Sequence, residues 1–210
     1  MFIELVDALR CPVLHEEGWL VAAAIRMEAR HIVAGTLGCP VCSAEYAIRD
    51  GVVDFRSSRG QRPATAAPHD ERVAPRLAAM LNLADSRGFA VLLGAWGSHA
   101  AALSAIVETP LILIDPPADI CGSPGISVLR CDRSVPLAIG AARAMAIDDG
   151  NADLVASAVR ATRAMGRVLA PVSVELPAGV RELARDDAVW VGERASDASP
   201  LVALHVRRAT

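Results

Sequence analysis

The chain has no lysine: each of its 21 basic residues is an arginine. This absence excludes the lysine of a phosphate-binding P-loop, Schiff-base catalysis and a lysine general base. Aromatic residues make up only 3% of the chain, which leaves little material for the stacking platform on which proteins bind single-stranded RNA. The net charge of −3 offers no basic surplus that would displace counterions from phosphates. We therefore expect no strong independent binding of nucleic acid.

Long apolar runs are also missing. No segment approaches the ~18–20 apolar residues that cross a bilayer, and the opening Met1-Phe2-Ile3-Glu4 lacks the basic start of a secretory signal. The five cysteines, two of them in a C-x-x-C pair, suit a metal site in a reducing compartment better than a disulfide framework. We expect a cytoplasmic protein with no membrane association.

Three cysteines near the start of the chain form a candidate metal site. Cys39 and Cys42 make a C-x-x-C turn, which can point two thiolates at one ion, and Cys11 supplies a third. The position three residues after Cys11 is Leu14, which cannot bind metal, but His15 beside it can. The predicted zinc ligands are therefore the three cysteines and His15. The alternative is that the metal has been lost and the cysteines are small buried apolar groups.

Residues 9–55 resemble the small zinc-ribbon domain of the activator subunit of tRNA methyltransferases and related bacterial proteins. The resemblance rests on the Cys-Pro turns, on the long segment of two predicted strands between them and on the ending Tyr46-Ala-Ile-Arg-Asp-Gly-Val. It covers about a quarter of the chain. It implies a small β-rich domain that binds a methyltransferase or is attached to one.

A polar stretch divides the chain. With a hydrophobic fraction of 53%, 210 residues suffice for two packed units. Residues 56–75 are polar and interrupted by proline and glycine, which is typical of a linker. We predict a zinc-ribbon-like domain over residues 1–57, a linker over 58–75 and a Rossmann-like α/β domain over 76–210.

Short apolar runs alternate with amphipathic stretches after the linker, a pattern typical of an open parallel sheet. Before the linker, two strands at 19–26 and 31–37 are joined by a charged turn at 27–30. After it, the predicted helices are 73–83, 100–107 and 152–165, and the predicted strands are 89–93, 111–114, 126–129 and 167–170. A helix over 136–145 and a strand over 144–147 compete for the same residues.

Small and acidic residues follow three consecutive predicted strands. Gly94 and Gly97 come after the first, Asp115 closes the second, and Asp132 lies just past the third. Nucleotide-type ligands bind at the carboxyl ends of such strands, where glycine lets the backbone approach a cofactor and a carboxylate accepts hydrogen bonds from it. Each acid alone is also an ordinary turn former or helix cap. Their succession predicts a cofactor site formed by these four residues.

From Phe89 onward the chain is similar to the class I S-adenosylmethionine-dependent methyltransferases. The phrases that carry the similarity are Val91-Leu-Leu-Gly-Ala-Trp-Gly, Leu111-Ile-Leu-Ile-Asp, Cys131-Asp-Arg-Ser-Val-Pro-Leu and residues 152–170. The similarity implies a parallel sheet closed by a C-terminal antiparallel hairpin, here residues 188–194 and 201–207. It also implies S-adenosylmethionine as the cofactor, with Asp115 at the ribose and Asp132 near the adenine.

The glycine loop departs from that family's pattern. Members usually carry an acid before the first glycine and a G-x-G spacing, but Leu92 and Leu93 precede Gly94, and Trp96 stands where the second glycine is expected. Three alternatives are open: the indole fills the methionine pocket, the indole swings outward, or the loop binds its ligand by another route.

Other polar residues give weaker signals. Asp148 and Asp149, beside a Gly-Asn pair, are either general bases or turn formers. His69, His99 and His205 have no spaced partner, so we interpret them as surface or packing residues.

Two functions remain open. The first is a methyltransferase-like pseudoenzyme that acts as a binding or scaffolding subunit and docks to another protein through the ribbon or a sheet edge. The alternative is an active S-adenosylmethionine-dependent methyltransferase acting on a nucleic acid or a protein, with the ribbon helping to present the substrate. Loss of one ribbon ligand and of the glycine spacing in the same chain favours the first.

Overall fold

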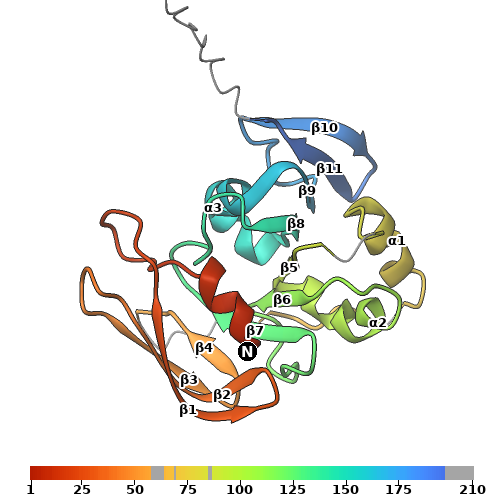
Figure 1. Cartoon of the computed structure of the whole chain (residues 1–210). Coiled ribbons are helices and arrows are strands. Elements are labelled where there is room, and N and C mark those ends of the chain that lie inside the picture. The colour runs from red at the N-terminus through yellow and green to blue at the C-terminus, as the bar shows by residue number, and fades with distance from the viewer. Residues whose placement is uncertain (58–63, 69, 85–86, 197–210) are drawn as a thin grey trace, which may run out of the picture.

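The computed structural model describes residues 1–57, 64–68, 70–84 and 87–196, and shows a mixed α/β fold built on one large sheet (Figure 1). The strands are β1 (Val21–Glu28), β2 (His31–Gly38), β3 (Glu45–Arg49), β4 (Val52–Asp54), β5 (Ala90–Leu93), β6 (Leu111–Ile114), β7 (Ile126–Arg130), β8 (Ala142–Ala146), β9 (Thr162–Pro171), β10 (Val180–Arg185) and β11 (Val189–Arg194). The α-helices are α1 (Val73–Met80), α2 (Ala100–Ser104) and α3 (Val155–Ala161), and the 3-10 helices are η1 (Ile3–Ala8), η2 (Gly94–His99) and η3 (Asp149–Leu154).

The strand order is that of a doubly wound sheet. Within the described chain, eleven strands pair in the order β1-β2-β3-β4-β7-β6-β5-β8-β9-β11-β10. Strands β7, β6, β5, β8 and β9 run parallel, whereas β11 lies antiparallel between β9 and β10. The order reverses between β5 and β8, so the parallel part matches the predicted fold class and is consistent with a Rossmann-like methyltransferase fold.

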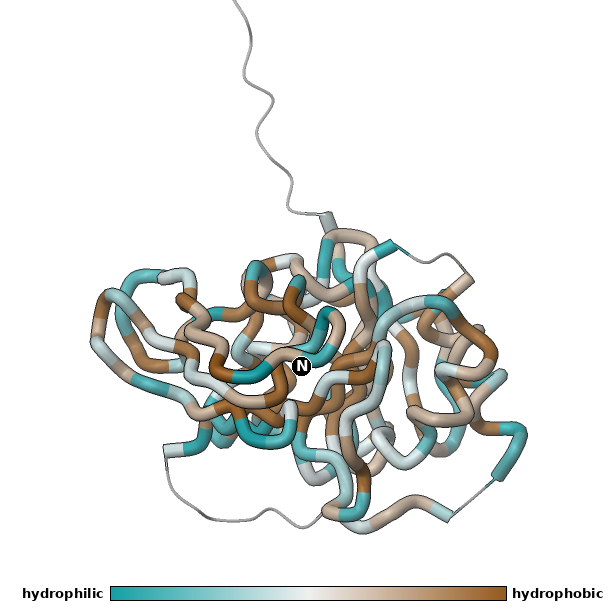
Figure 2. The backbone as a smooth tube through the Cα atoms, turned by 60° about the horizontal axis from the view of Figure 1, so that its bottom comes forward, coloured by the Kyte–Doolittle hydropathy of each residue, from teal (hydrophilic) through white to brown (hydrophobic). Residues whose placement is uncertain are grey.

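Alternate residues of the central strands face two different layers. In β5, Leu92 packs with the layer that contains α1 and α2, whereas Val91 and Leu93 pack with α3 and the N-terminal segment. All three side chains are fully buried, and each such burial stabilises the fold by ~1.5–3 kcal/mol. Figure 2 shows hydrophobic residues concentrated in the interior of the molecule, with hydrophilic residues in the peripheral turns.

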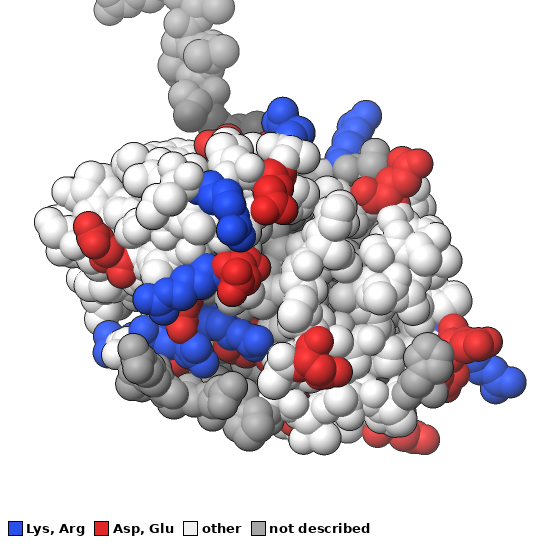
Figure 3. All heavy atoms as spheres, turned by 90° about the horizontal axis from the view of Figure 1, so that it is seen from below, with Lys and Arg blue, Asp and Glu red and all other residues white. Residues whose placement is uncertain are grey.

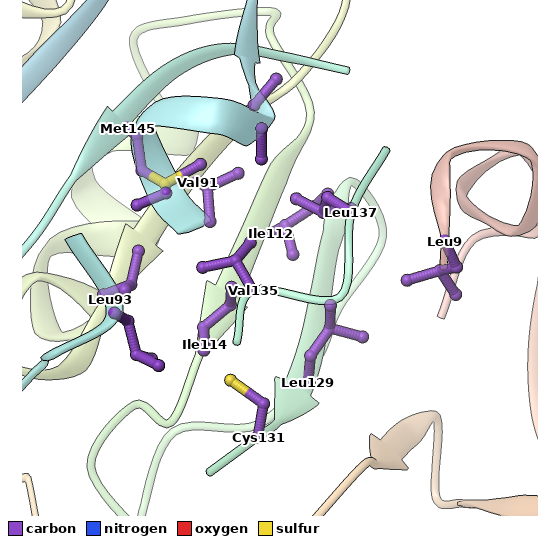
Figure 4. Close-up of a cluster of buried hydrophobic side chains, with 14 of the residues drawn as sticks. Leu9, Val91, Leu93, Ile112, Ile114, Leu129, Cys131, Val135, Leu137 and Met145 are labelled. Carbon is purple, nitrogen blue, oxygen red and sulfur yellow. The ribbon is translucent and has the colours of Figure 1, made fainter. Parts of the chain in front are cut away.

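The first four strands extend the same sheet. Strand β4 pairs in parallel with β7, in a register that places Val53 opposite Leu129. Leu5 and Leu9 of the N-terminal segment belong to the same buried cluster as Leu129. Figure 4 shows Leu9 across from the side chains of β5, β6 and β7, and Leu9 also bridges to Leu137. The domain limits at 57 and 75 remain a prediction, but the two segments share one core.

This shared core predicts the result of limited proteolysis. Trypsin should cut first in the predicted linker, and the C-terminal fragment should keep its own sheet. We expect the two fragments to elute together in size-exclusion chromatography, because β4–β7 pairing and the packing of Leu5 and Leu9 hold them. Earlier cleavage within residues 90–170 would contradict the domain division, and separate elution without denaturant would contradict the shared core.

The C-terminal hairpin differs from the prediction. The run 188–194 is confirmed as a strand, β11, but its hairpin partner is β10, and residues 201–207 lie outside the described residues. Strand β10 carries Arg181, Glu182 and Arg185 and is mostly exposed. Charged residues are typical of edge strands, so this segment shows no apolar signal in the sequence.

One helix prediction is wrong in part, and one open choice between a helix and a strand is settled as a strand. The predicted helix 152–165 is helical as α3 only to Ala161, after the 3-10 helix η3, and β9 begins at once with Thr162. Gly166 lies where a Cβ would be 2.6 Å from the carbonyl oxygen of Arg143, so the strand is already closely paired there. The competing helix over 136–145 does not form, because residues 142–146 are buried as the parallel strand β8 beside β5.

Candidate functional site

The four predicted metal ligands come together at one end of the first hairpin. Cys39 directly follows β2, Cys42 lies in the turn before β3, and Cys11 and His15 come from the segment after η1. The turn is tight because the N–H of Ser43 donates to the carbonyl of Cys39 at 2.9 Å, with Ser43 at φ 59°. This conformation aims both thiols of the C-x-x-C pair toward one point.

The distances within this group fit tetrahedral coordination. The sulfurs of Cys11 and Cys42 are 3.7 Å apart, and the Cys39 sulfur lies 3.4 Å from Nε2 of His15. All four ligand atoms lie within 4.8 Å of one another, so the group can hold a metal ion. For Zn–S of ~2.3 Å and Zn–N of ~2.0–2.1 Å, the edges of a tetrahedron are about 3.8 Å between sulfurs and about 3.6 Å between sulfur and nitrogen.

Neighbouring groups prepare these ligands for a cation. Burial alone would raise the pKa of Cys39, but hydrogen bonds from the backbone N–H groups of Cys42 and Val41 outweigh it and lower the pKa to about 7. Nδ1 of His15 faces the carbonyl of Glu16, which assigns the ring proton to Nδ1 and leaves Nε2 as the ligand.

Tyr46 contacts one of the four metal ligands, Cys11, and the sequence did not predict this contact. Its hydroxyl is 3.1 Å from the Cys11 sulfur, and burial, followed by the contact with Cys11, raises the pKa of Tyr46. The hydroxyl thus stays protonated and can donate to a Cys11 thiolate. Burial also raises the pKa of Cys11 itself, so this donor supports the charged form that a metal needs.

The second candidate site is the crevice at the carboxyl ends of β5 and β8, where the strand order reverses. The 3-10 helix η2 follows β5, and Ile147 and Asp148 follow β8. Asp148 accepts a hydrogen bond from the N–H of Ala95 at 2.8 Å, and the indole N–H of Trp96 donates to the carbonyl of Ile147 at 3.0 Å. We call these two contacts the crevice bridge.

The two predicted glycines make room for the chain's own side chains. Gly94 has φ +57°, and a Cβ there would lie 2.0 Å from a carboxylate oxygen of Asp148. A Cβ on Gly97 would lie 2.6 Å from Cβ of Pro116. The backbone is therefore closely approached, but the approaching groups are Asp148 and Pro116, whereas the sequence analysis predicted a cofactor there.

The two predicted acids have different surroundings. Asp115 is buried at the end of β6, and its carboxylate accepts from the N–H of Cys131 at 3.2 Å. Asp132 accepts from both the N–H and the hydroxyl of Ser57, at 3.0 and 2.7 Å. Burial alone would raise the pKa of Asp132, but these two bonds lower it. Asp115 lies at the same edge as the glycine loop, whereas Asp132 binds Ser57, the last residue before the predicted linker.

Two cavities flank the crevice bridge. One, of about 490 Å³, is lined by Asp115, Asp148 and the turn that follows Asp148. The other, of about 440 Å³, lies between η2, α1 and the start of β11. Asp148 lines both, so the bridge divides the crevice between them. From the sequence, Asp148 was interpreted as a general base or a turn former. Its position just after the end of β8 is the signal that could have placed it in the crevice.

The histidines and the surface charges complete this description. His99 is buried with its ring 6.1 Å from that of Trp96, in agreement with a packing role, and His69 and His205 lie outside the described residues. On the face in Figure 3, basic and acidic side chains are intermixed and broad areas carry no charge. Among the described residues, no helix has both the length and the hydropathy needed to cross a membrane.

Comparison with known proteins gives only weak structural likeness. No protein-family model matches the chain, and no curated protein matches it. The chain is similar to a T. thermophilus 16S rRNA methyltransferase solved with AdoMet and guanosine, at 18% identity and a TM-score of 0.33. The match covers 81% of this chain and 47% of that protein, so the chain spans about half of its length. A TM-score of this size supports no functional conclusion.

Proposed function

We propose that this protein is a zinc-stabilised, methyltransferase-like binding subunit whose crevice does not admit S-adenosylmethionine. The crevice bridge carries the proposal. A cofactor at a switch point needs exposed backbone N–H groups after the first strand, and the N–H of Ala95 is already bonded to Asp148. Trp96 also crosses to the end of β8, where its ring is fixed by Ile147.

Zinc is the metal that best suits the Cys11, His15, Cys39 and Cys42 group. Three thiolates and one imidazole are soft and borderline ligands, and four protein ligands close a tetrahedral sphere. With no position left for water or substrate, such an ion stabilises structure and does not catalyse. Its role would be to tie the segment after η1 to the turn between β2 and β3.

The docking face of this subunit would be the outer edge of the sheet. Strand β1 is the edge strand in the described chain, and its side chains are mostly exposed. Ile25 is 83% exposed and Val21 62% exposed. Exposed apolar residues along an edge strand are characteristic of surfaces that bind another protein.

Calorimetry with S-adenosylmethionine tests the proposal. We expect the wild-type protein to bind no more tightly than millimolar. Trp96→Gly should allow weak binding without restoring catalysis, because Leu92 and Leu93 still provide no carboxylate for the cofactor's amino group. Trp19→Gly, which changes an exposed tryptophan outside the crevice, should leave the cofactor response unchanged.

One observation favours the alternative of an active methyltransferase. Asp115 is buried at the end of the second parallel strand and lines a cavity of about 490 Å³, the place where a ribose would bind. Binding of the cofactor by the wild type at micromolar concentration, about −8 kcal/mol, would overturn the closed crevice and establish this alternative.

A further inference from the structure

The cavity of about 440 Å³ beside the crevice bridge is built from apolar walls. Val73, Leu77 and Met80 of α1 form one side, and Val189 at the start of β11 forms another. Trp96 of η2 lines it as well. Its volume lies within the ~300–1,000 Å³ typical of sites for small organic molecules. The cavity therefore has the size and lining of a ligand site.

The indole of Trp96 is held in a fixed position on this lining. Its N–H donates to the carbonyl of Ile147, which prevents the ring from turning about its long axis without loss of that bond. The ring of His99 lies 6.1 Å away at an angle of 51°. A fixed aromatic ring with its N–H already bonded offers a ligand its face, and the face of indole attracts cations.

The charges on the lining have one dominant sign. Asp70, Asp148 and Asp149 contribute carboxylates, and among the described lining residues Arg76 is the one arginine. Arg76 forms an ion pair with Asp186, which offsets its charge. A ligand in this cavity therefore meets a negative potential beside an apolar wall. An anion is disfavoured there, and a neutral molecule gains from the apolar wall alone.

We propose that this cavity binds a small organic ammonium ion with an apolar body, such as an alkyl or aryl amine. The apolar body lies against α1 and Val189, and the ammonium group lies between the face of Trp96 and the carboxylates. The site needs neither the metal ion nor S-adenosylmethionine, but it shares the position of Trp96 with the proposed function. Titration with an amine and titration with S-adenosylmethionine distinguish failure of the one from failure of the other.

Three compounds of matched shape test the proposal: 2-phenylethylamine, 2-phenylethanol and phenylacetate. An amine with a pKa near ~10 is charged at pH 7. In calorimetry on the full chain, we expect the amine to bind about tenfold more tightly than the alcohol, as a cation–π contact and nearby carboxylates would produce. Phenylacetate should not bind. Added salt should weaken the binding of the amine and leave the binding of the alcohol unchanged.

NMR locates the site. The chain has three tryptophans, and the indole N–H signal of Trp96 can be assigned by its loss in Trp96→Phe. The amine should shift this signal and leave those of Trp19 and Trp190 unchanged. Asp149→Asn should weaken binding of the amine about threefold to tenfold, with no effect on the alcohol. Asp119→Asn, at an exposed residue that is not part of the lining, is the matched control.

Three results would overturn the proposal. The first is no heat and no shift at tens of millimolar amine. The second is equal affinity for the amine and the alcohol. The third is a response of Trp19 or Trp190 in place of Trp96.

Discussion

Cys42→Ser is expected to release the metal ion and to lower the free energy of unfolding by more than about 4 kcal/mol, the range in which loss of a structural metal falls. The sulfur of Cys42 lies 3.7 Å from that of Cys11, so its removal leaves three ligands around an ion that needs four. Elemental analysis should find about one zinc per wild-type chain and almost none in the variant. Thermal or denaturant unfolding measures the loss of stability.

Cys121→Ser is the matched control for this experiment, because Cys121 is exposed and is not part of the metal group. It should keep the zinc and the wild-type stability. Tyr46→Phe should retain the metal with about 10–100-fold lower affinity, as expected for loss of a donor to a ligand. The proposal of a zinc site would be contradicted if freshly prepared wild-type protein contained no zinc and all three thiols were freely titratable.

Gly94→Ala is expected to destabilise the protein by about 2.5–5 kcal/mol. The left-handed backbone at φ +57° accounts for about 1–2 kcal/mol. The remainder, about 1.5–3 kcal/mol, comes from displacing the Asp148 carboxylate and breaking its bond to Ala95. Denaturant unfolding at pH 7 measures the difference.

Gly125→Ala separates these two contributions. Gly125 also has a positive φ, +81°, but a Cβ there would have no heavy atom within 4 Å. Gly125→Ala should lower the free energy of unfolding only by the backbone contribution of about 1–2 kcal/mol. The double variant Gly94→Ala with Asp148→Ala should lose less than the two single variants added together, because the clash is then absent. Equal effects at Gly94 and Gly125 would show that Asp148 does not press on Gly94, and the crevice bridge would have to be abandoned.

The predictable part of the fold follows from local sequence patterns. The run Leu111–Ile114 is wholly apolar and bounded by Pro110 and Asp115, so its strand was predicted with the observed limits. The strand β10 was missed because its charged residues lie at an exposed edge, where no apolar face is needed. The sequence left a helix over 136–145 and a strand over 144–147 as alternatives, and burial beside β5, a contact remote in sequence, favours the strand.

The metal group could be identified from residue types alone. A Cys-Pro turn with two thiols, a third cysteine and a nearby histidine predict a shared ion, because the chemistry of the ligands and the short loop are both local. Only the tertiary structure brought His15 to 3.4 Å from Cys39 and placed Tyr46 on Cys11, since those contacts span the first hairpin.

By itself the sequence determined the main alternation of strands and helices and the glycines and acids at the strand ends, because each depends on residues within one or two turns of chain. It also determined the chemistry of the metal ligands, because that depends on residue type. Only the tertiary structure decided which groups cross the crevice. The bonds of Asp148 to Ala95 and of Trp96 to Ile147 join residues more than fifty positions apart. Such contacts depend on which strand ends lie side by side, and the order of the strands in the folded sheet determines which ends are neighbours.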